Sequence, residues 1–421
     1  MKSVGIIAEY NPFHNGHKYQ IDTLRGQGAD TIAVVMSGCF VQRGAPAWTD
    51  KYLRTRMALA CGADLVFELP TVFALSSAPH FAMGGVSSLS ALGVDSICFG
   101  SECGTIEPLE QVADFLWKAE ERELGDAGYQ EAIQSAVRSG ISYPAARQKA
   151  LQQAFPELFQ KYPVLVSAPN NILSIEYLKA MKRIGSSLHP MTITRCDAGY
   201  HSKELSGSFA SASAIRDSFF KTDSLDASTE ALPTACHKLL LQYTDRYPVR
   251  TDDFSSILYG ILRRIHAPEE YVKYGDISPE LAQRIYKQLA SYGTISSFTE
   301  QIKTKNYTYN RISRCLFQLL LKIPSEYSDD TGQTVPYLRL LGMRRSKSSF
   351  LRQIRSLPVI TKVADYEAVL KTFYGAGTPE YQYADTCFQT DLLAADLYRH
   401  ILHPEPSFGL KDEYRQGIIT C

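Results

Sequence analysis

The chain has 421 residues, of which 45% are hydrophobic, and its 44 acidic and 44 basic side chains give no net charge. This length exceeds one ordinary core and predicts two or three domains, while the balanced charge excludes a uniformly basic nucleic-acid-binding protein but not a local basic surface. The nine cysteines show neither CxxC pairs nor zinc-finger spacing, so we expect reduced thiols in a cytoplasmic protein and no metal site. The opening apolar run, residues 4–8, is too short for a signal sequence or a membrane span.

The first 105 residues alternate short apolar runs with helical stretches. Strands are predicted at Val4–Ala8, Thr31–Met36, Asp64–Leu69 and Asp95–Gly100. These runs lie about 20–30 residues apart, which is the spacing of βαβ units with right-handed crossovers. The pattern predicts an α/β fold with a Rossmann-like parallel sheet.

The remaining chain predicts an insertion, a second α/β stretch and a helical C-terminal part. Residues 106–160 are polar and helix-like, and we expect an insertion that covers the site as a lid. Strands are predicted at Tyr162–Val166 and Met191–Thr194, with a helix at Ser174–Ile184 between them. Further on we predict helices at Ser255–His266, Pro279–Tyr292 and Arg311–Leu321, and a loop at Pro324–Pro336. The expected domains are therefore an α/β domain over residues 1–225 and a mainly α-helical domain over residues 226–421.

The first strand runs into Tyr10-Asn11-Pro12-Phe13-His14-Asn15-Gly16-His17, where a helix begins. A strand, a tight turn and a helix N-terminus form an anion site, because unpaired N–H groups and the helix dipole face the ligand. Gly16 allows a phosphate to approach the backbone, and the two histidines can donate hydrogen bonds to charge that builds on an α-phosphate. The alternative is a pair of capping or surface histidines; a zinc site would need a third ligand that the sequence does not show. We expect an ATP site with His14 and His17 as catalytic residues.

Other candidate site residues follow later predicted strands or begin a helix. Ser211, Ser213 and Arg216 form a serine-rich helix start that can hold β- and γ-phosphates, and we expect Arg216 to be a third catalytic residue, although such a start alone is usually an N-cap. Gly100, the pair Asn170-Asn171 and Arg195 follow predicted strands, where ligands of open α/β sheets bind. The structural alternatives are a turn glycine, a helix cap and a surface ion pair.

The strings VGIIAEYNPFHNGHKYQ, MSGCFVQRGAPA, PNNILSIEYLKA, TITRCDAGYHS and SASAIR resemble the bacterial tRNA(Met) cytidine acetate ligases of the HIGH nucleotidyltransferase superfamily. The similarity is specific to about residue 220 and looser beyond. It departs at Cys39, where the family has Asn, and at Ser174, where Gly is common. The resemblance implies that ATP and acetate give acetyl-adenylate, and that the acetyl group passes to N4 of the wobble cytidine of elongator tRNA(Met), forming N4-acetylcytidine.

The resemblance also implies which residues bind ATP, and it is the sole source of acetate and of this tRNA as partners. The implied ATP site comprises Ile7, Ala8, Glu9, Tyr10, Asn11, Pro12, Phe13, His14, Asn15, Gly16, His17, Lys18, Tyr19, Gln20, Gly100, one of Asn170 and Asn171, and Arg195. Triphosphate chemistry usually involves Mg²⁺, but the sequence shows no dedicated pair of carboxylates.

A basic surface for tRNA is predicted in the C-terminal part. Residues 337–355 carry six basic side chains and no acidic one, and we expect four of them to bind tRNA: Arg339, Arg344, Arg345 and Lys347. Upstream, residues 303–314 interleave lysine and arginine with tyrosine. Such mixtures suit backbone contacts combined with stacking on unpaired bases, and their alternative is the solvated face of ordinary helices.

Two alternatives to the acetate ligase remain at the level of sequence. One is a small-molecule adenylyltransferase that joins AMP to a phosphorylated cofactor precursor, which would leave the basic helical part without a role. The other is a non-catalytic, nucleotide-responsive RNA-binding protein, against which the retention of His14, His17 and Arg216 argues.

Overall fold

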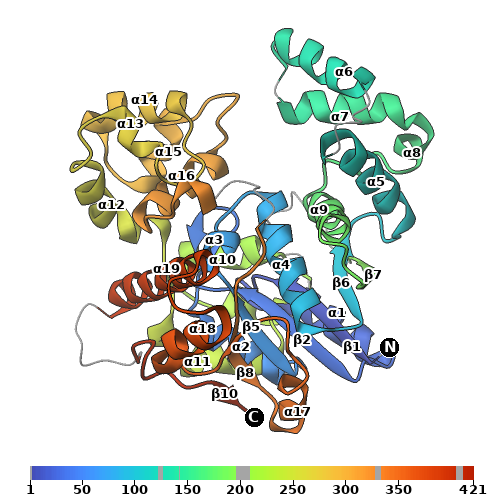
Figure 1. Cartoon of the computed structure of the whole chain (residues 1–421), viewed down its shortest axis with the longest axis vertical. Coiled ribbons are helices and arrows are strands. Elements are labelled where there is room, and N and C mark those ends of the chain that lie inside the picture. Colours follow the sequence, from blue (N-terminus) through green and yellow to red (C-terminus); the bar gives the residue numbers. More distant parts are fainter. Residues whose placement is uncertain (1, 122–126, 142, 196–208, 328–332, 404–410) are drawn as a thin grey trace.

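The computed structural model describes residues 2–121, 127–141, 143–195, 209–327, 333–403 and 411–421 (Figure 1). One large sheet organises the molecule, and its strand order is β10-β8-β5-β2-β1-β6-β7. Five of these strands run parallel: β1 (Ser3–Ala8), β2 (Thr31–Ser37), β5 (Leu65–Leu69), β6 (Ser96–Ser101) and β7 (His189–Thr194). The four predicted N-terminal strands and the later strand at 191–194 are thereby confirmed, as is the Rossmann-like α/β fold.

The prediction of a strand at Tyr162–Val166 is wrong. These residues follow helix α8 (Pro156–Lys161) in consecutive turns, in which Leu165 N–H donates to the Tyr162 carbonyl and Ala168 N–H to the Val164 carbonyl. Because these donors bond locally, they are not available to a neighbouring strand. The next helix, α9 (Pro169–Arg183), begins at the proline and not at Ser174 as predicted.

The central strands are buried on both faces, and alternate residues face two different cores. On β2, Ala33 and Val35 belong to one core, while Ile32, Val34 and Met36 belong to the other. The first core contains side chains of α3 (Thr71–Ala74), α4 (Ala78–Leu92) and α9. The second contains side chains of α1 (Asn15–Gly26), α2 (Lys51–Ala60), α10 (Ala212–Thr222) and α11 (Thr234–Gln242). The sheet is therefore a rigid layer between two helical layers.

The C-terminal part adds strands to this sheet, which the expectation of a mainly helical second domain did not include. Strand β8 (Leu338–Met343) pairs antiparallel with β5, and β9 (Val359–Ile360) and β10 (Ile419–Thr420) pair with β8. Helices α17 (Ser348–Leu351), α18 (Tyr366–Tyr374) and α19 (Pro379–Leu402) accompany these strands. Residues on both sides of position 225 thus share one sheet.

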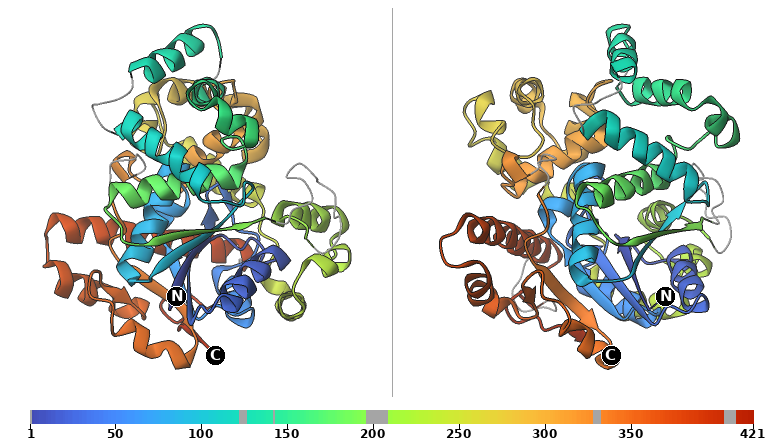
Figure 2. Two further views of the ribbon diagram at one scale, coloured as in Figure 1. Left: turned by 90° about the vertical axis from the view of Figure 1, so that its right-hand side faces the viewer. Right: turned by 45° about the vertical axis from the view of Figure 1, so that its right-hand side comes forward.

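Two helical lobes stand on the same side of the molecule (Figures 1 and 2). One lobe is the helical segment expected from the polar composition of residues 106–160, with α5 (Glu107–Glu121), α6 (Ala127–Arg138), α7 (Tyr143–Ala154) and α8. The other contains α12 (Ser255–Leu262), α13 (Pro268–Tyr271), α14 (Pro279–Gln288), α15 (Ile295–Ile302) and α16 (Tyr309–Leu320). Strand β6 ends at Ser101 and leads directly into α5, so the first lobe lies at the carboxyl ends of the parallel strands.

Two smaller features complete the fold. A short hairpin of β3 (Phe40–Val41) and β4 (Ala45–Pro46) follows the end of β2. The described part of the predicted loop at 324–336 holds one short 3-10 turn, Ser325–Tyr327. Among the described residues, no helix has both the length and the apolar character needed to cross a bilayer.

Candidate nucleotide-binding site

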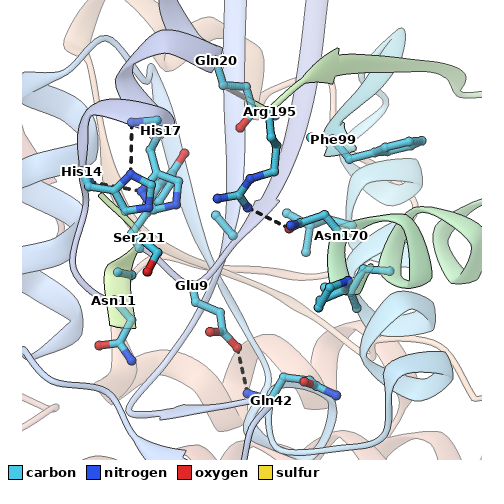
Figure 3. Close-up of a pocket in the computed structure, with 18 of the residues that line it drawn as sticks. Glu9, Asn11, His14, His17, Gln20, Gln42, Phe99, Asn170, Arg195 and Ser211 are labelled. Carbon is cyan, nitrogen blue, oxygen red and sulfur yellow. Dashed lines mark hydrogen bonds between the residues drawn. The ribbon is translucent and has the colours of Figure 1, made fainter. Parts of the chain in front are cut away.

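A pocket of about 330 Å³ opens where β1, β6 and β7 end, as ligand sites of open α/β sheets do (Figure 3). Its wall combines cationic and imidazole side chains with apolar ones. Of the predicted site residues, the wall includes Ile7, Ala8, Glu9, Tyr10, Asn11, His14, Gly16, His17, Tyr19, Gln20, Gly100, Asn170, Arg195, Ser211, Ser213 and Arg216. Segments far apart in the sequence therefore meet at one cavity.

The turn between β1 and α1 fixes the two histidines through their own backbone. His14 is the N-cap of α1, and its Nδ1 accepts a hydrogen bond from the Gly16 N–H at 3.0 Å. The His14 N–H donates in turn to His17 Nδ1 at 3.2 Å, and the two rings stack with centroids 3.7 Å apart. Because each Nδ1 acts as an acceptor, each neutral imidazole carries its proton on Nε2. Both rings can therefore donate from Nε2.

Both histidines are held in the uncharged form. Burial lowers the pKa of His14 to about 3, and the nearby charges of Arg195 and Arg216 act in the same direction. Burial also places the pKa of His17 well below its ordinary value, with further contributions from His14 and Arg195. At neutral pH the site thus offers two neutral N–H donors beside two guanidinium groups.

Arg195 is positioned by a chain of polar contacts from the end of β6. Its Nη1 donates to Asn170 Oδ1 at 2.8 Å, and Asn170 Nδ2 donates to Glu102 Oε1 at 2.6 Å. A Cβ atom on Gly100 would lie only 3.1 Å from Arg195 Cγ, so glycine at this position leaves room for the arginine. Gly100, Asn170 and Arg195, which were predicted to bind ATP, therefore lie together on one side of the pocket.

The structure separates the two candidate asparagines, because only one of them lines the pocket. Asn171 is fully buried and does not line the pocket. Its Oδ1 accepts hydrogen bonds from the backbone N–H groups of Glu102 and Cys103, so the side chain holds the loop after β6. Asn170 is the asparagine that faces the pocket.

The start of α10 supplies the opposite wall. Ser211 caps this helix, since its Oγ accepts from the Ala214 N–H at 3.2 Å, and it lies 3.0 Å from Ser213 Oγ. Arg216 Nη1 donates to the Asn11 carbonyl at 2.5 Å, which ties α10 to the β1–α1 turn. Burial and the charge of Arg43 lower the Arg216 pKa, against the opposing effect of Glu9, but an arginine remains protonated. Residues 196–208, which connect Arg195 to the residues before this helix, lie outside the described residues.

Four further residues predicted to bind ATP do not line the pocket: Pro12, Phe13, Asn15 and Lys18. The Phe13 ring is fully buried against Tyr10, with centroids 4.6 Å apart. Asn15 Nδ2 donates to the Glu230 carbonyl, and Lys18 forms an ion pair with Asp22 on the other face of α1. All of residues 7–20 were predicted to bind ATP, but side chains in a turn and on a helix face different directions, so only some of them reach the pocket.

The sequence argument missed two groups of pocket residues. The first is the β3–β4 hairpin, with Val41, Gln42, Arg43, Ala45 and Pro46. The second is apolar and includes Phe81, Phe99, Leu173, Tyr177 and Ile193. The hairpin lies in the family-like string MSGCFVQRGAPA, which was a usable signal. The apolar side chains carry no local signal, because their pattern is the same as that of core residues.

The predicted tRNA contact at Arg339 is wrong. This side chain is 3% exposed and lies in a buried ion-pair network, with its Nη1 3.0 Å from Glu68 Oε2 and its Nη2 bonded to Glu413. These two carboxylates compensate the charge of Arg339, and a buried cation without such partners would be strongly unfavourable.

The other predicted tRNA contacts lie at the end of the sheet remote from the pocket. Arg344 N–H donates to the Asp64 carbonyl just before β5, and Lys347 Nζ donates to the Asp30 carbonyl just before β2. Arg345 is exposed in the same turn. Six strand residues separate the two ends of the sheet, which corresponds to about 20 Å. A nucleic acid that touches these cations would do so at least that far from a base in the pocket.

The paired histidines at the first strand–helix turn, the serine–arginine helix start and the pocket at the strand ends define a HIGH nucleotidyl transferase. The model of the HIGH Nucleotidyl Transferase family matches residues 1–412. A protein of Acetivibrio thermocellus is 36% identical over all of both chains, and one of a Thermoanaerobacter species is 38% identical over 94% of this chain and 95% of its own. Both relatives are named tRNA(Met) cytidine acetate ligase.

Solved structures agree with this assignment. Thermotoga maritima TmcAL bound with alpha-thio ATP superposes with a TM-score of 0.87 at 29% identity over all of both chains. Its apo form gives a TM-score of 0.89 over 100% of this chain and 99% of its own. The chain belongs to the tRNA(Met) cytidine acetate ligase family, and it is therefore a ligase.

Proposed function

We propose that this protein uses ATP to activate acetate as acetyl-adenylate, and then acetylates N4 of the wobble cytidine of elongator tRNA(Met) in the cytoplasm. The observation that carries the proposal is the neutral, Nε2-protonated pair of His14 and His17, set beside Arg195 and Arg216 in one pocket. Full-length similarity to relatives named for this reaction supports the choice of acetate and tRNA.

In the first step, an acetate oxygen forms a bond to the α-phosphorus, and pyrophosphate leaves. Charge develops on the α-phosphoryl oxygens and on the departing group, where preorganised donors are most effective. The Nε2–H groups of His14 and His17 would face the α-phosphate, with Arg216, Ser211 and Ser213 around the departing pyrophosphate. Gly100, Asn170 and Arg195 would hold the nucleoside. These side chains are fixed by their own hydrogen bonds, so little reorganisation is needed during the reaction.

In the second step, the acetyl group moves from the adenylate to the cytidine amine, and AMP leaves. Because water would hydrolyse the adenylate, the site must be covered while it exists. We assign that cover to the helical segment at 106–160, since a short loop joins α5 to β6, whose residues Phe99 and Gly100 line the pocket. Removal of the tip, α6 and α7, should raise acetyl-adenylate hydrolysis, and an unchanged ratio of acetylated tRNA to AMP would count against the assignment.

Mg²⁺ would enter mainly with the triphosphate. No group of three or more His, Cys, Asp or Glu side chains among the described residues is arranged to hold a metal ion. The ion would neutralise charge on the triphosphate, and Mg²⁺ in such chemistry needs no large protein cage.

We place the tRNA on the lobe of α12–α16 rather than at 344–347. This lobe is joined to the pocket rim, because Ser313 Oγ donates to the Gly44 carbonyl at 2.5 Å in the β3–β4 hairpin. Gly44 is so close to α16 that a Cβ atom would lie 2.4 Å from the Arg314 nitrogen. Lys305 is exposed at the start of this segment, and Arg311 lies over the Tyr307 ring. Cations and aromatic rings on a lobe that contacts the pocket hairpin suit an anticodon loop whose bases are unpaired.

One experiment separates this function from the two alternatives. The protein is incubated with ATP and radiolabelled pyrophosphate, with and without acetate, and then with tRNA. Acetate-dependent exchange followed by acetylation of tRNA supports the ligase. Transfer of AMP to a phosphorylated small molecule would identify an adenylyltransferase, and ATP binding without either reaction would identify a nucleotide-responsive RNA-binding protein.

A further inference from the structure

Glu9 is the only acidic residue among the described residues that line the pocket. The remaining charged and imidazole groups of the wall are His14, His17, Arg43, Arg195 and Arg216, which suit anionic ligands. ATP and acetate are both anions, so a carboxylate at this position repels them and weakens the first step. Its presence therefore points to a role with a substrate that is not anionic at its reacting atom.

Glu9 is held in place by hydrogen bonds to its backbone and to one carboxylate oxygen, while the described residues provide no donor for the other oxygen. Its backbone carbonyl accepts a hydrogen bond from the buried Arg54 at 2.8 Å, and its Oε1 accepts from the Gln42 N–H at 2.9 Å. Its Oε2 accepts no hydrogen bond from the described chain, and Glu9 forms no ion pair with another described residue. Figure 3 shows the carboxylate directed toward Gln42 and away from the His14 and His17 rings. Oε2 is thus a fixed acceptor in the pocket.

The surroundings of Glu9 suit a flat, neutral ring. Tyr177 is close enough for the Glu9 charge to raise its pKa, in addition to the larger effect of burial. Phe81, Leu173 and Pro46 belong to the same wall. Pockets that receive an extruded nucleobase are lined in this way, with apolar faces around the ring and polar groups at its edge. On the other side, Arg216 is near enough for its pKa to respond to Glu9.

We propose that Glu9 is the catalytic base of the acetyl-transfer step, an assignment that rests on the proposed function. Its Oε2 accepts a hydrogen bond from the exocyclic N4 amine of cytosine, a pairing that carboxylates make with this base. The amine nitrogen then forms a bond to the acetyl carbon while the bond from that carbon to the AMP oxygen breaks. The amine proton passes to Glu9 and later to water, and AMP leaves as an anion beside Arg216.

The same placement accounts for the choice of base. Cytosine presents an N–H₂ donor at this edge, whereas uracil presents a carbonyl oxygen, which a carboxylate repels. A uridine at the wobble position lacks the nucleophile and would also bind poorly. Glu9 thereby links base selection to proton removal in one group.

The test uses E9Q in the full-length protein and measures the two half-reactions separately. Acetate-dependent ATP–pyrophosphate exchange reports adenylate formation, and we expect E9Q to reduce it far less than the transfer step, because the Glu9 carboxylate is directed away from the His14 and His17 rings. Acetyl transfer to tRNA from chemically prepared acetyl-adenylate reports the second step alone. We expect E9Q to slow this transfer about 100-fold or more, the usual effect of losing a general base. E9D, which keeps a shorter carboxylate, should recover part of the rate.

E102Q is the matched control, because Glu102 is a nearby carboxylate that supports Asn170 without lining the pocket. It should raise the KM for ATP in exchange and the KM for acetyl-adenylate in transfer, because both carry the adenosine next to Asn170, while the transfer rate at saturating acetyl-adenylate stays near normal. Equal unfolding temperatures of E9Q and wild type would exclude a folding defect.

Two results would overturn the assignment of Glu9. Transfer at the wild-type rate in E9Q would show that the carboxylate is not the base, and a parallel loss of exchange and transfer, corrected by excess Mg²⁺, would make it a metal ligand. If the wild-type protein itself fails to acetylate tRNA from acetyl-adenylate, the proposed function fails instead.

Discussion

Individual side chains in the nucleotide site have two tasks, one structural and one chemical. His14 shows both, because its Nδ1 caps α1 through the Gly16 N–H while its Nε2 is left to donate to a ligand. His17 repeats the arrangement, with Nδ1 turned to the His14 backbone. The two tasks can be separated by mutation, since they use different ring nitrogens.

H14N should keep the cap and lose the chemistry. Asparagine is a good N-cap and can accept the Gly16 N–H, so the free energy of unfolding should change little, whereas H14A should lose about 1 kcal/mol. Both variants lack the Nε2 donor, and we expect each to reduce acetate-dependent pyrophosphate exchange about 100-fold or more. Near-normal exchange in H14N would contradict the role of the Nε2 proton.

The depressed pKa of His14 also predicts how stability depends on pH. The folded protein binds the proton only near pH 3, whereas the unfolded chain binds it near its ordinary pKa of 6.5. Between these values the unfolded state carries more protons, so stability contributed by this residue is lost as pH falls from about 6.5, by at most about 1.4 kcal/mol per pH unit. Denaturant unfolding of wild type and H14N from pH 7 to pH 4 should show a smaller decline in the variant. Parallel curves would show that His14 titrates normally.

Among the elements, helix α1 determines how the side chains of the histidine motif lie in the pocket. A Cβ atom on Gly16 would lie 2.9 Å from His14 Cε1, so alanine at this position must displace the imidazole. Gly26 ends the same helix, and a Cβ there meets nothing within 4 Å.

We therefore expect G16A to reduce pyrophosphate exchange at least tenfold, a loss of about 1.4 kcal/mol in transition-state binding. G26A should leave exchange unchanged and stabilise the protein by up to about 1 kcal/mol, since glycine is a poor helix former. Equal exchange rates in the two variants would show that the close contact at Gly16 is unimportant.

The elements also show where sequence reasoning succeeds. The apolar runs of β1, β2, β5 and β6 are largely buried, and a glycine turn precedes each of the last three, so they are visible locally. The run at 162–166 has a similar composition, but its backbone groups form hydrogen bonds within local turns. Strand β8 was not predicted, because its pairing with β5, more than 270 positions away, has no local signature. Its arginine, Arg339, was interpreted as part of a basic surface, whereas it forms a buried ion pair.

The candidate site divides in the same way. The histidine motif, Gly100, Asn170, Arg195 and the α10 start were predicted because turns and helix ends bear recognisable residues. The apolar wall and the separation of Asn170 from Asn171 needed the three-dimensional packing, since neighbours in sequence can face a cavity and a core.

For the molecule as a whole, the sheet has two ends with different environments. The pocket and the rim of the α12–α16 lobe lie at one end, and the cations at 344–347 lie at the other. This arrangement predicts that matched charge reversals at the two ends have unequal effects.

K305E, an exposed reversal on the α12–α16 lobe, should weaken tRNA binding several-fold and reduce its salt dependence, because phosphate contacts release counterions. R345E, an exposed reversal at the remote end, should have a smaller effect, and both variants should keep pyrophosphate exchange without tRNA. Binding measured over a salt series would distinguish them. A larger loss in R345E would move the tRNA surface back to the remote end.

The central claim is that this chain joins acetate to a tRNA cytidine at the expense of ATP. The most direct measurement is mass analysis of the nucleosides of elongator tRNA(Met) after incubation with the purified protein, ATP and acetate. We expect N4-acetylcytidine at the wobble position, dependent on both ATP and acetate, with one AMP released for each acetyl group. Unmodified cytidine in tRNA, while ATP is turned over with acetate or another acceptor, would contradict it.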